Sequence, residues 1–401
     1  GMADRATGQV LLFSASNYER CFITQCAIAP WNNGVYVSTI RIGEKARKIR
    51  GRQPDPPQFC LSRLDPTGAE WDLFASEDQC WTGRGMFFHF AANPDGWFAG
   101  VPRAEPSFQL FPDGHYEEWL TALGSGFAVS FSPLDGLPWI RTRTGLLLRV
   151  HDDMETCTVL ARFPLDRHGV STQAPNMCSD GSALVADHHR LVRVTPDGTC
   201  ILQPVSINDH GRPSQRAPVK SVAYGTLNGT YNLSEIRDVP TYAPDYDEYR
   251  FDGLCVDSSN RVYCTIDESF VSEEEVRPTP TPVWSFMLAA STEEPVTFTQ
   301  VHTCTIHRRA DGGLNLCVGP DNSLIMYNKE RVASAPGVTE GPVFGVSRNC
   351  LTKAGVRCLA ELPHQSRKVT GITARSNRRT QRQRHTHTTT ATHTHNDSDT
   401  H

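Results

Sequence analysis

Ala174-Pro-Asn-Met-Cys-Ser-Asp-Gly-Ser-Ala-Leu-Val-Ala-Asp187, followed by Leu191-Val-Arg-Val-Thr-Pro-Asp-Gly198, places two Asp-Gly turns between short runs of strand-forming residues. An Asp-Gly pair flanked by such runs is typical of a β-hairpin turn. Two hairpins in succession make four antiparallel strands. The segment therefore predicts one small four-stranded sheet.

The same double-hairpin unit recurs along the whole chain, while helical periodicity is nearly absent. Where no long loop intervenes, the repeat length is close to the roughly 40 to 45 residues of a propeller blade. The turns predicted for the six units are, in order, Pro30–Gly34 with Asp65–Gly68, Asp95–Gly96 with Asp113–Gly114, Asp135–Gly136 with His151–Asp153, Asp180–Gly181 with Asp197–Gly198, Asp257–Asn260 with Ser291–Glu294, and Pro320–Asn322 with Leu351–Gly355. A sandwich or a pair of barrels would not repeat one four-stranded unit so regularly. We therefore predict an all-β fold, a single six-bladed β-propeller.

Several segments fall outside the repeat. The opening strand Gly8–Ser14 has no partner in the first unit, so we expect it to close the ring by pairing in the last blade. The stretches 41–57, 206–250 and 267–282 are longer than turns and are expected to be lids or mobile segments. From residue 364 the chain is rich in Arg, Thr and His and poor in large apolar residues. We therefore predict a propeller over residues 1–363 and a disordered tail over 364–401.

Composition narrows the range of partners. A formal net charge of -5 over 401 residues gives no global basic field, so nucleic acid is not expected to bind. No apolar run reaches the roughly 18 residues that span a bilayer, and the first residues lack the apolar core of a secretory signal. We expect a cytoplasmic protein with no membrane partner. The 13 cysteines form no Cys-x-x-Cys pair, and Cys255, Cys264 and Cys317 alternate within strand-like runs, which favours buried, reduced thiols.

Several common catalytic motifs are missing from the sequence. It contains no G-x-S-x-G, H-E-x-x-H, G-x-G-x-x-G or P-loop pattern. Chemistry of the serine-hydrolase, zincin, dinucleotide and nucleoside-triphosphate types therefore loses most of its support.

One segment carries a resemblance to a known family. Phe251-Asp-Gly-Leu-Cys-Val-Asp-Ser-Ser-Asn-Arg-Val-Tyr-Cys-Thr265 resembles the inner hairpin of the fifth blade in the regucalcin/gluconolactonase (SMP-30-like) propellers. That hairpin opens with an Asp-Gly-hydrophobic motif and leads to an Asp and a turn. The resemblance implies that Asp252 is a metal ligand and the general base.

The resemblance also suggests two further ligands. Asn176 falls where the family has its metal-binding Asn, although Gln173 competes for this place because the loop is short. Counting back from Val35 places Gln25 where the family has the Glu of a Glu-Gly-Pro-Val start, and an amide holds a hard cation more weakly than a carboxylate. A Glu-Gly-Pro-Val string does occur at 340–343, but it is expected before the third strand of blade six.

The resemblance implies a metal-dependent hydrolase of a small-molecule lactone or ester, with its site in the central channel. A divalent cation, calcium or zinc, at Asp252, Asn176 and Gln25 would polarise the carbonyl while Asp252 helps to activate water. Two alternatives stay open. Asp252 and Asp257 can simply cap turns at a strand entrance, and the propeller can be a non-catalytic scaffold that binds a protein partner.

Overall fold

A computed structural model describes the following residues: 3–4, 9–14, 21–41, 58–64, 70–75, 87–102, 106–124, 126–163, 173–187, 190–207, 212–214, 227–236, 249–268, 281–304, 306, 314–319, 321–328 and 330–338. By its contacts the chain divides into two units, residues 1–339 and 340–401, and every described residue belongs to the first. The predicted tail over 364–401 and the Glu-Gly-Pro-Val string at 340–343 lie outside the described residues.

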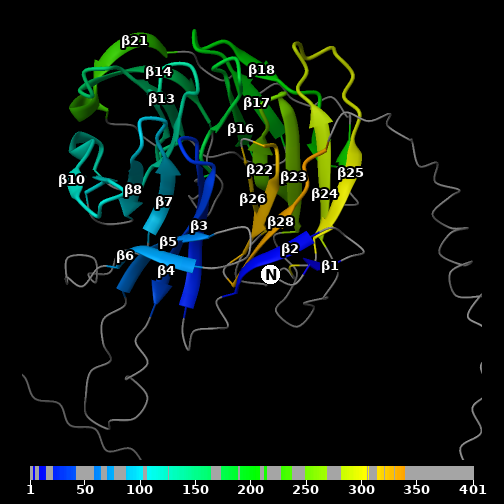
Figure 1. The fold of residues 1–401 in the computed structure, drawn as a ribbon. Helices are drawn as coiled ribbons and strands as arrows, with labels where there is room; N and C mark the ends of the chain where they lie inside the picture. The colour runs from blue at the N-terminus through cyan, green and yellow to red at the C-terminus, as the bar shows by residue number, and fades with distance from the viewer. Residues whose placement is uncertain are drawn as a thin grey trace, which may run out of the picture. The chain divides into compact units, whose positions relative to one another are not determined.

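Six antiparallel sheets follow one another along the chain (Figure 1). From the channel outward, blade one consists of β3 (Cys21–Ala29), β4 (Gly34–Arg41), β5 (Gln58–Leu64) and β6 (Glu70–Ala75). Blade two consists of β7 (Phe87–Ala92), β8 (Phe98–Pro102), β9 (Phe108–Leu110) and β10 (Tyr116–Glu118). Blade three consists of β11 (Ala128–Phe131), β12 (Pro138–Arg141), β13 (Leu146–Val150), β14 (Thr156–Arg162) and β21 (Leu227–Asn232). Blade four consists of β15 (Asn176–Met177), β16 (Ala183–Asp187), β17 (Arg190–Val194) and β18 (Cys200–Leu202). Blade five consists of β22 (Tyr249–Val256), β23 (Arg261–Glu268), β24 (Thr281–Met287) and β25 (Thr299–Cys304). Blade six consists of β26 (Asn315–Val318), β27 (Leu324–Tyr327), β28 (Arg331–Ala335), β2 (Gln9–Ser14) and β1 (Ala3–Asp4). The predicted six-bladed propeller is confirmed.

The two ends of the ring meet in blade six. β2 pairs antiparallel with β28, so the opening strand closes the ring as predicted. The second hairpin turn predicted at Leu351–Gly355 lies outside the described residues. Within them, the third strand, β28, ends at Ala335, and its outer neighbour β2 comes from the start of the chain. For the same reason, the string at 340–343 follows the third strand instead of preceding it.

The first turn of every blade contains one residue in the left-handed backbone region. These residues are Asn33, Gly96, Gly136, Gly181, Asn260 and Asn322. Glycine adopts this conformation without strain, and asparagine tolerates it better than other side chains. The Gly and Asn signals that revealed the repeat therefore mark one conserved geometry in all six blades.

The predicted long loop over 206–250 is partly ordered secondary structure. β19 (Ser206–Ile207) and β20 (Pro213–Ser214) form a short hairpin, and β21 pairs with β14 as a fifth strand of blade three. The 3-10 helix η5 (Leu233–Glu235) follows β21, and η4 (Thr121–Leu123) precedes β11. Blade three is thus one strand wider than a four-stranded blade.

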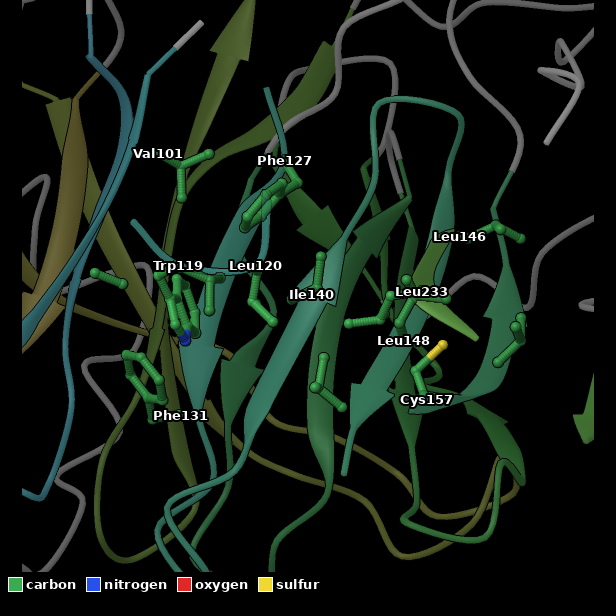
Figure 2. Close-up of a cluster of buried hydrophobic side chains, with 14 of the residues drawn as sticks. Val101, Trp119, Leu120, Phe127, Phe131, Ile140, Leu146, Leu148, Cys157 and Leu233 are labelled. Carbon is green, nitrogen blue, oxygen red and sulfur yellow. The ribbon is translucent and has the colours of Figure 1, made fainter. Parts of the chain in front are cut away.

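The hydrophobic core lies between the blades. The described residues form six buried clusters, and each cluster joins one pair of neighbouring sheets, including blade six with blade one. Figure 2 shows the cluster between blades two and three, where Trp119 and Phe131 lie with their ring centroids 6.0 Å apart. Apolar burial is therefore shared around the whole ring, and the inner strands stay at fixed positions around the channel.

Polar side chains add a second set of contacts between neighbouring inner and middle strands. The blade-to-blade hydrogen bonds of this set are Phe90 N to Gln25 Oε1, His89 Nε2 to Val129 O, Arg141 Nη1 to Ala186 O, Gln173 Nε2 to Phe251 O, and Thr265 Oγ1 to Leu314 O. They join blades one to two, two to three, three to four, four to five and five to six. Several of the same side chains line the channel, as described below.

The described cysteines agree with the prediction of reduced thiols. The nine cysteines whose side chains are described are free, and Cys255 and Cys264 are buried while Cys317 is half-buried. Burial raises the pKa of Cys317 to about 12. Among the described residues, no helix has the length and apolar character needed to cross a membrane.

Candidate functional site

A cavity of about 450 Å³ lies among the innermost strands. All six blades contribute to its wall, through β3, β7, β11, the segment 173–177 that includes β15, β22 and β26. Among the described residues that line it, Asp252 is the single carboxylate, and none is a lysine or an arginine.

The structure brings the predicted site residues together. Asp252, Asn176 and Gln25 come from blades five, four and one, and all three line this cavity. The competing residue, Gln173, lines it as well. A convergence of distant sequence positions on the channel is what the propeller architecture predicts.

Three of the inner strands have a register shift in their pairing beside the cavity. The pairing register shifts between Ile23 and Gln25 in β3 and between Phe87 and His89 in β7. In β22 the shift lies between Phe251 and Leu254, and so includes Asp252. A bulge of this kind bends a strand and redirects its side chains, and bulges are common beside functional sites.

Close packing between blades five and six requires a glycine after Asp252. A Cβ atom at this position would overlap the carbonyl oxygen of Leu314 in blade six and lie 2.8 Å from the Thr265 hydroxyl. The backbone N–H of Gly253 donates to that hydroxyl at 2.8 Å, and the hydroxyl donates to Leu314 O at 2.9 Å. The Asp-Gly pair therefore has a packing reason, the close approach of blades five and six.

Gln25 joins the first two blades. Its Oε1 accepts a hydrogen bond of 2.8 Å from the backbone N–H of Phe90. An oxygen that already accepts a hydrogen bond is a poorer ligand for a cation than a free one. This contact gives Gln25 a role in the fold that needs no metal.

Gln173 makes hydrogen bonds to the backbone at Asp252, whereas the side-chain hydrogen bond of Asn176 is to a residue of its own segment. Gln173 Nε2 donates to the backbone oxygens of Phe251, at 2.9 Å, and Asp252. Its Oε1 is buried and has no hydrogen-bond partner in the described part of the chain. Asn176 is half-buried, and its Nδ2 donates at 3.3 Å to Ala174 O.

The register of the blades also favours Gln173 over Asn176. Gln173 precedes Gly181 by the same number of residues as Gln25 precedes Asn33. Asp252 precedes Asn260 by that number too. Gln173 is therefore the fourth-blade counterpart of Gln25 and Asp252, measured from the left-handed residue of each turn.

His89 is a channel residue that the sequence did not single out. It lies in β7, is 7% exposed and lines the cavity. Its Nε2 lies 2.6 Å from the backbone oxygen of Val129 in blade three. Burial lowers the pKa of His89 to about 4, so the ring is neutral at neutral pH. Counting back from Asp95–Gly96, as was done for Gln25 from Val35, would have pointed to this part of β7.

The donor atoms around the cavity suit a hard cation held weakly. Asp252 offers a carboxylate, Asn176 an amide oxygen, and Gln173 a buried amide oxygen without a partner in the described chain. Calcium prefers such oxygen ligands, whereas zinc prefers imidazole and thiolate. Within the described residues, no three His, Cys, Asp or Glu side chains come together as a metal-binding group. The residues present therefore fit calcium better than zinc, with one carboxylate to offset its charge.

No family model matches the chain, and no curated protein matches it. A solved structure provisionally named as a gluconolactonase is 13% identical, with 83% of this chain and 93% of that chain covered and a TM-score of 0.41. A gluconolactonase of Xanthomonas campestris is 11% identical, with coverage of 82% and 89% and a TM-score of 0.40.

A streptogramin B lyase structure is 10% identical, with coverage of 81% and 96% and a TM-score of 0.39. At these identities the comparisons assign no role to any residue of this chain. The chain differs from these proteins in most of its residues.

Proposed function

We propose that the chain hydrolyses a small lactone or ester in the central channel. One observation carries the proposal. Asp252, Asn176 and Gln25 were selected from three separate parts of the sequence, and they line one cavity. That cavity has the volume of a small-molecule site, and its wall combines polar groups with apolar side chains such as Phe90 and Phe131.

Asp252 is the residue that can move a proton. Its carboxylate oxygen would take a proton from a water molecule as the water oxygen attacks the carbonyl carbon of the substrate. The carbonyl carbon then loses its bond to the ester oxygen, and the proton passes from Asp252 to that leaving oxygen. No proton is gained or lost overall in these steps.

The amide side chains would hold the reacting groups in place. Gln173 fixes the backbone around Asp252 through its two hydrogen bonds, so the carboxylate keeps one orientation. A divalent cation held by Asp252, Asn176 and Gln25, with Gln173 as an alternative ligand, would polarise the substrate carbonyl.

A second function is a non-catalytic propeller that binds a protein partner. It is favoured by the blade-to-blade hydrogen bonds of Gln25 and Gln173, which explain both amides without any chemistry. On this view the channel is a structural centre, and a partner binds elsewhere on the propeller.

The two functions differ in their response to one substitution. Hydrolysis of glucono-δ-lactone and of simple esters would be measured with a pH indicator for the wild type, Asp252→Asn and the exposed control Asp113→Asn. We expect Asp252→Asn to lower the rate by about a hundredfold or more, since a general base contributes that much, and Asp113→Asn to leave it unchanged. Asn keeps the shape of Asp, and the melting temperature shows that each variant is folded.

Calcium supplies the second part of the test. We expect added calcium to raise the melting temperature of the wild type and to raise it less in Asp252→Asn, because a ligand that binds only the folded state stabilises it. No hydrolysis by the wild type, together with a melting temperature that neither calcium nor zinc changes, would sink the hydrolase and favour the scaffold.

A further inference from the structure

His89 lines the cavity, and the hydrogen-bonding state of one ring nitrogen follows from the contact that the other nitrogen makes. A backbone carbonyl oxygen only accepts hydrogen bonds, so the nitrogen that faces Val129 O at 2.6 Å, Nε2, must carry the hydrogen. A neutral imidazole has a single N–H, and Nδ1 is then an acceptor with a free lone pair. The contact with blade three thus sets the tautomer of the ring.

Nδ1 has no hydrogen-bond partner in the part of the chain that the structure describes. The His89 side chain is more than nine-tenths buried and forms part of the cavity wall. An acceptor nitrogen in a cavity wall can take a hydrogen bond from water or from a ligand in the cavity. Here the cavity is the place from which a donor can come.

His89 shares with Asp252 a position at an irregularity of an inner strand, although it precedes the left-handed residue of its turn by seven residues and Asp252 by eight. Both residues lie at an inner-strand register shift, in β7 and β22, and both line the same cavity. His89 donates a hydrogen bond to blade three through Nε2, and its Nδ1 can accept one from another group. Gln25 has the equivalent place in β3, but its oxygen already accepts the N–H of Phe90.

We propose that His89 is a substrate-binding residue whose Nδ1 accepts a hydrogen bond from a hydroxyl group of the substrate. This role deepens the proposed hydrolase function and rests on it, because the bound hydroxyl compound is a substrate only if the chain hydrolyses it. It assigns to the channel a preference for lactones or esters that bear a free hydroxyl over those with only alkyl or ether groups. An acceptor in the wall favours such substrates, because an analogue without the donor cannot pair with it.

Binding is tested on the full chain without relying on turnover. The imidazole nitrogens of His89 would be followed by ¹⁵N NMR at neutral pH while myo-inositol, a ring with many hydroxyl groups, is added. Dioxane, a ring of similar kind that only accepts hydrogen bonds, is the matched control. We expect an unprotonated Nδ1 whose resonance moves saturably with myo-inositol and does not move with dioxane.

Two variants separate the acceptor from the contact between blades. His89→Gln keeps an N–H donor for Val129 O and takes the acceptor away from the Nδ1 position, so we expect a melting temperature near that of the wild type and binding of myo-inositol weakened about tenfold. His89→Asn keeps an oxygen near the Nδ1 position and loses the donor to Val129 O. For this variant we expect a lower melting temperature with binding largely kept.

Substrate preference gives the second readout. In His89→Gln we expect the KM for glucono-δ-lactone to rise about tenfold, with the KM for unsubstituted δ-valerolactone unchanged. A protonated Nδ1 in the wild type, or equal responses to myo-inositol and dioxane, would overturn the proposal. An absence of all hydrolysis together with saturable binding of myo-inositol would overturn the hydrolase and keep His89 as a binding residue.

Discussion

Thr265→Val is a sharp test of how blades five and six are joined beside Asp252. The Thr265 hydroxyl is buried and makes two hydrogen bonds, accepting from Gly253 N at 2.8 Å and donating to Leu314 O at 2.9 Å. Valine has nearly the same shape and no hydroxyl, so the substitution removes both hydrogen bonds without opening a cavity. The change leaves one buried N–H and one buried carbonyl without partners.

The expected cost follows from those two backbone groups. Each buried polar group that loses its partner costs about 1–3 kcal/mol, so the pair would cost roughly 2–6 kcal/mol. Valine offsets part of this, because the hydroxyl no longer has to be removed from water on folding, which leaves a net loss of roughly 2–4 kcal/mol. With an unfolding entropy of about 2.1 cal/mol/K per residue, each kcal/mol lowers the melting temperature of a domain of this length by about 1.5 °C.

The assay combines unfolding with amide exchange. Urea unfolding and calorimetry would compare the wild type, Thr265→Val and the control Thr230→Val, which changes an exposed strand residue and is expected to stay within about 0.5 kcal/mol. The Gly253 amide should also exchange its hydrogen faster in Thr265→Val, since its acceptor is gone. A loss of stability no larger than that of Thr230→Val, with unchanged exchange at Gly253, would refute the reasoning.

Two further predictions concern the channel wall. Gly253→Ala should lower stability by roughly 1–3 kcal/mol because its Cβ would meet the rigid backbone of blade six, whereas Gly96→Ala, with φ +100 and open space around it, should cost only about 1 kcal/mol. Equal melting temperatures for the two variants would contradict this. Burial lowers the pKa of His89 from its ordinary value of 6.5 to about 4. Between these two pH values, the His89 ring is protonated in the unfolded chain and neutral in the folded chain. Relative to His89→Gln, the wild type should therefore lose roughly 3 kcal/mol as the pH falls from 6.5 to 4, and parallel pH profiles would show that His89 is not held neutral by burial.

The turns made most of the fold predictable from sequence. An Asp-Gly or Asn turn needs a left-handed residue, and this requirement is local, so Gly96, Gly181 and Asn260 could be found without knowing the partners of any strand. The closing strand was predictable because Gly8–Ser14 had no nearby partner. The outer strand of blade six comes from the start of the chain, so a repeat of four consecutive strands does not describe this blade.

The candidate site was less predictable than the fold. Asp252 was found through the resemblance of its Asp-Gly motif to the gluconolactonase-type hairpin, and the glycine of that motif has a packing reason in the approach of Gly253 to blade six. The choice between Asn176 and Gln173, and the place of His89, depend on strand register and on bulges. A bulge shifts a side chain from one face to the other and leaves no mark in the hydrophobic pattern.

The most direct measurement of the central claim is the location of a bound divalent cation. Crystals grown with manganese would show the ion by its anomalous scattering. The account predicts a peak in the channel cavity within ligand distance of the Asp252 carboxylate, and no peak there in Asp252→Asn. A cavity that holds only water in both proteins, or ions bound only on the outer surface, would contradict it.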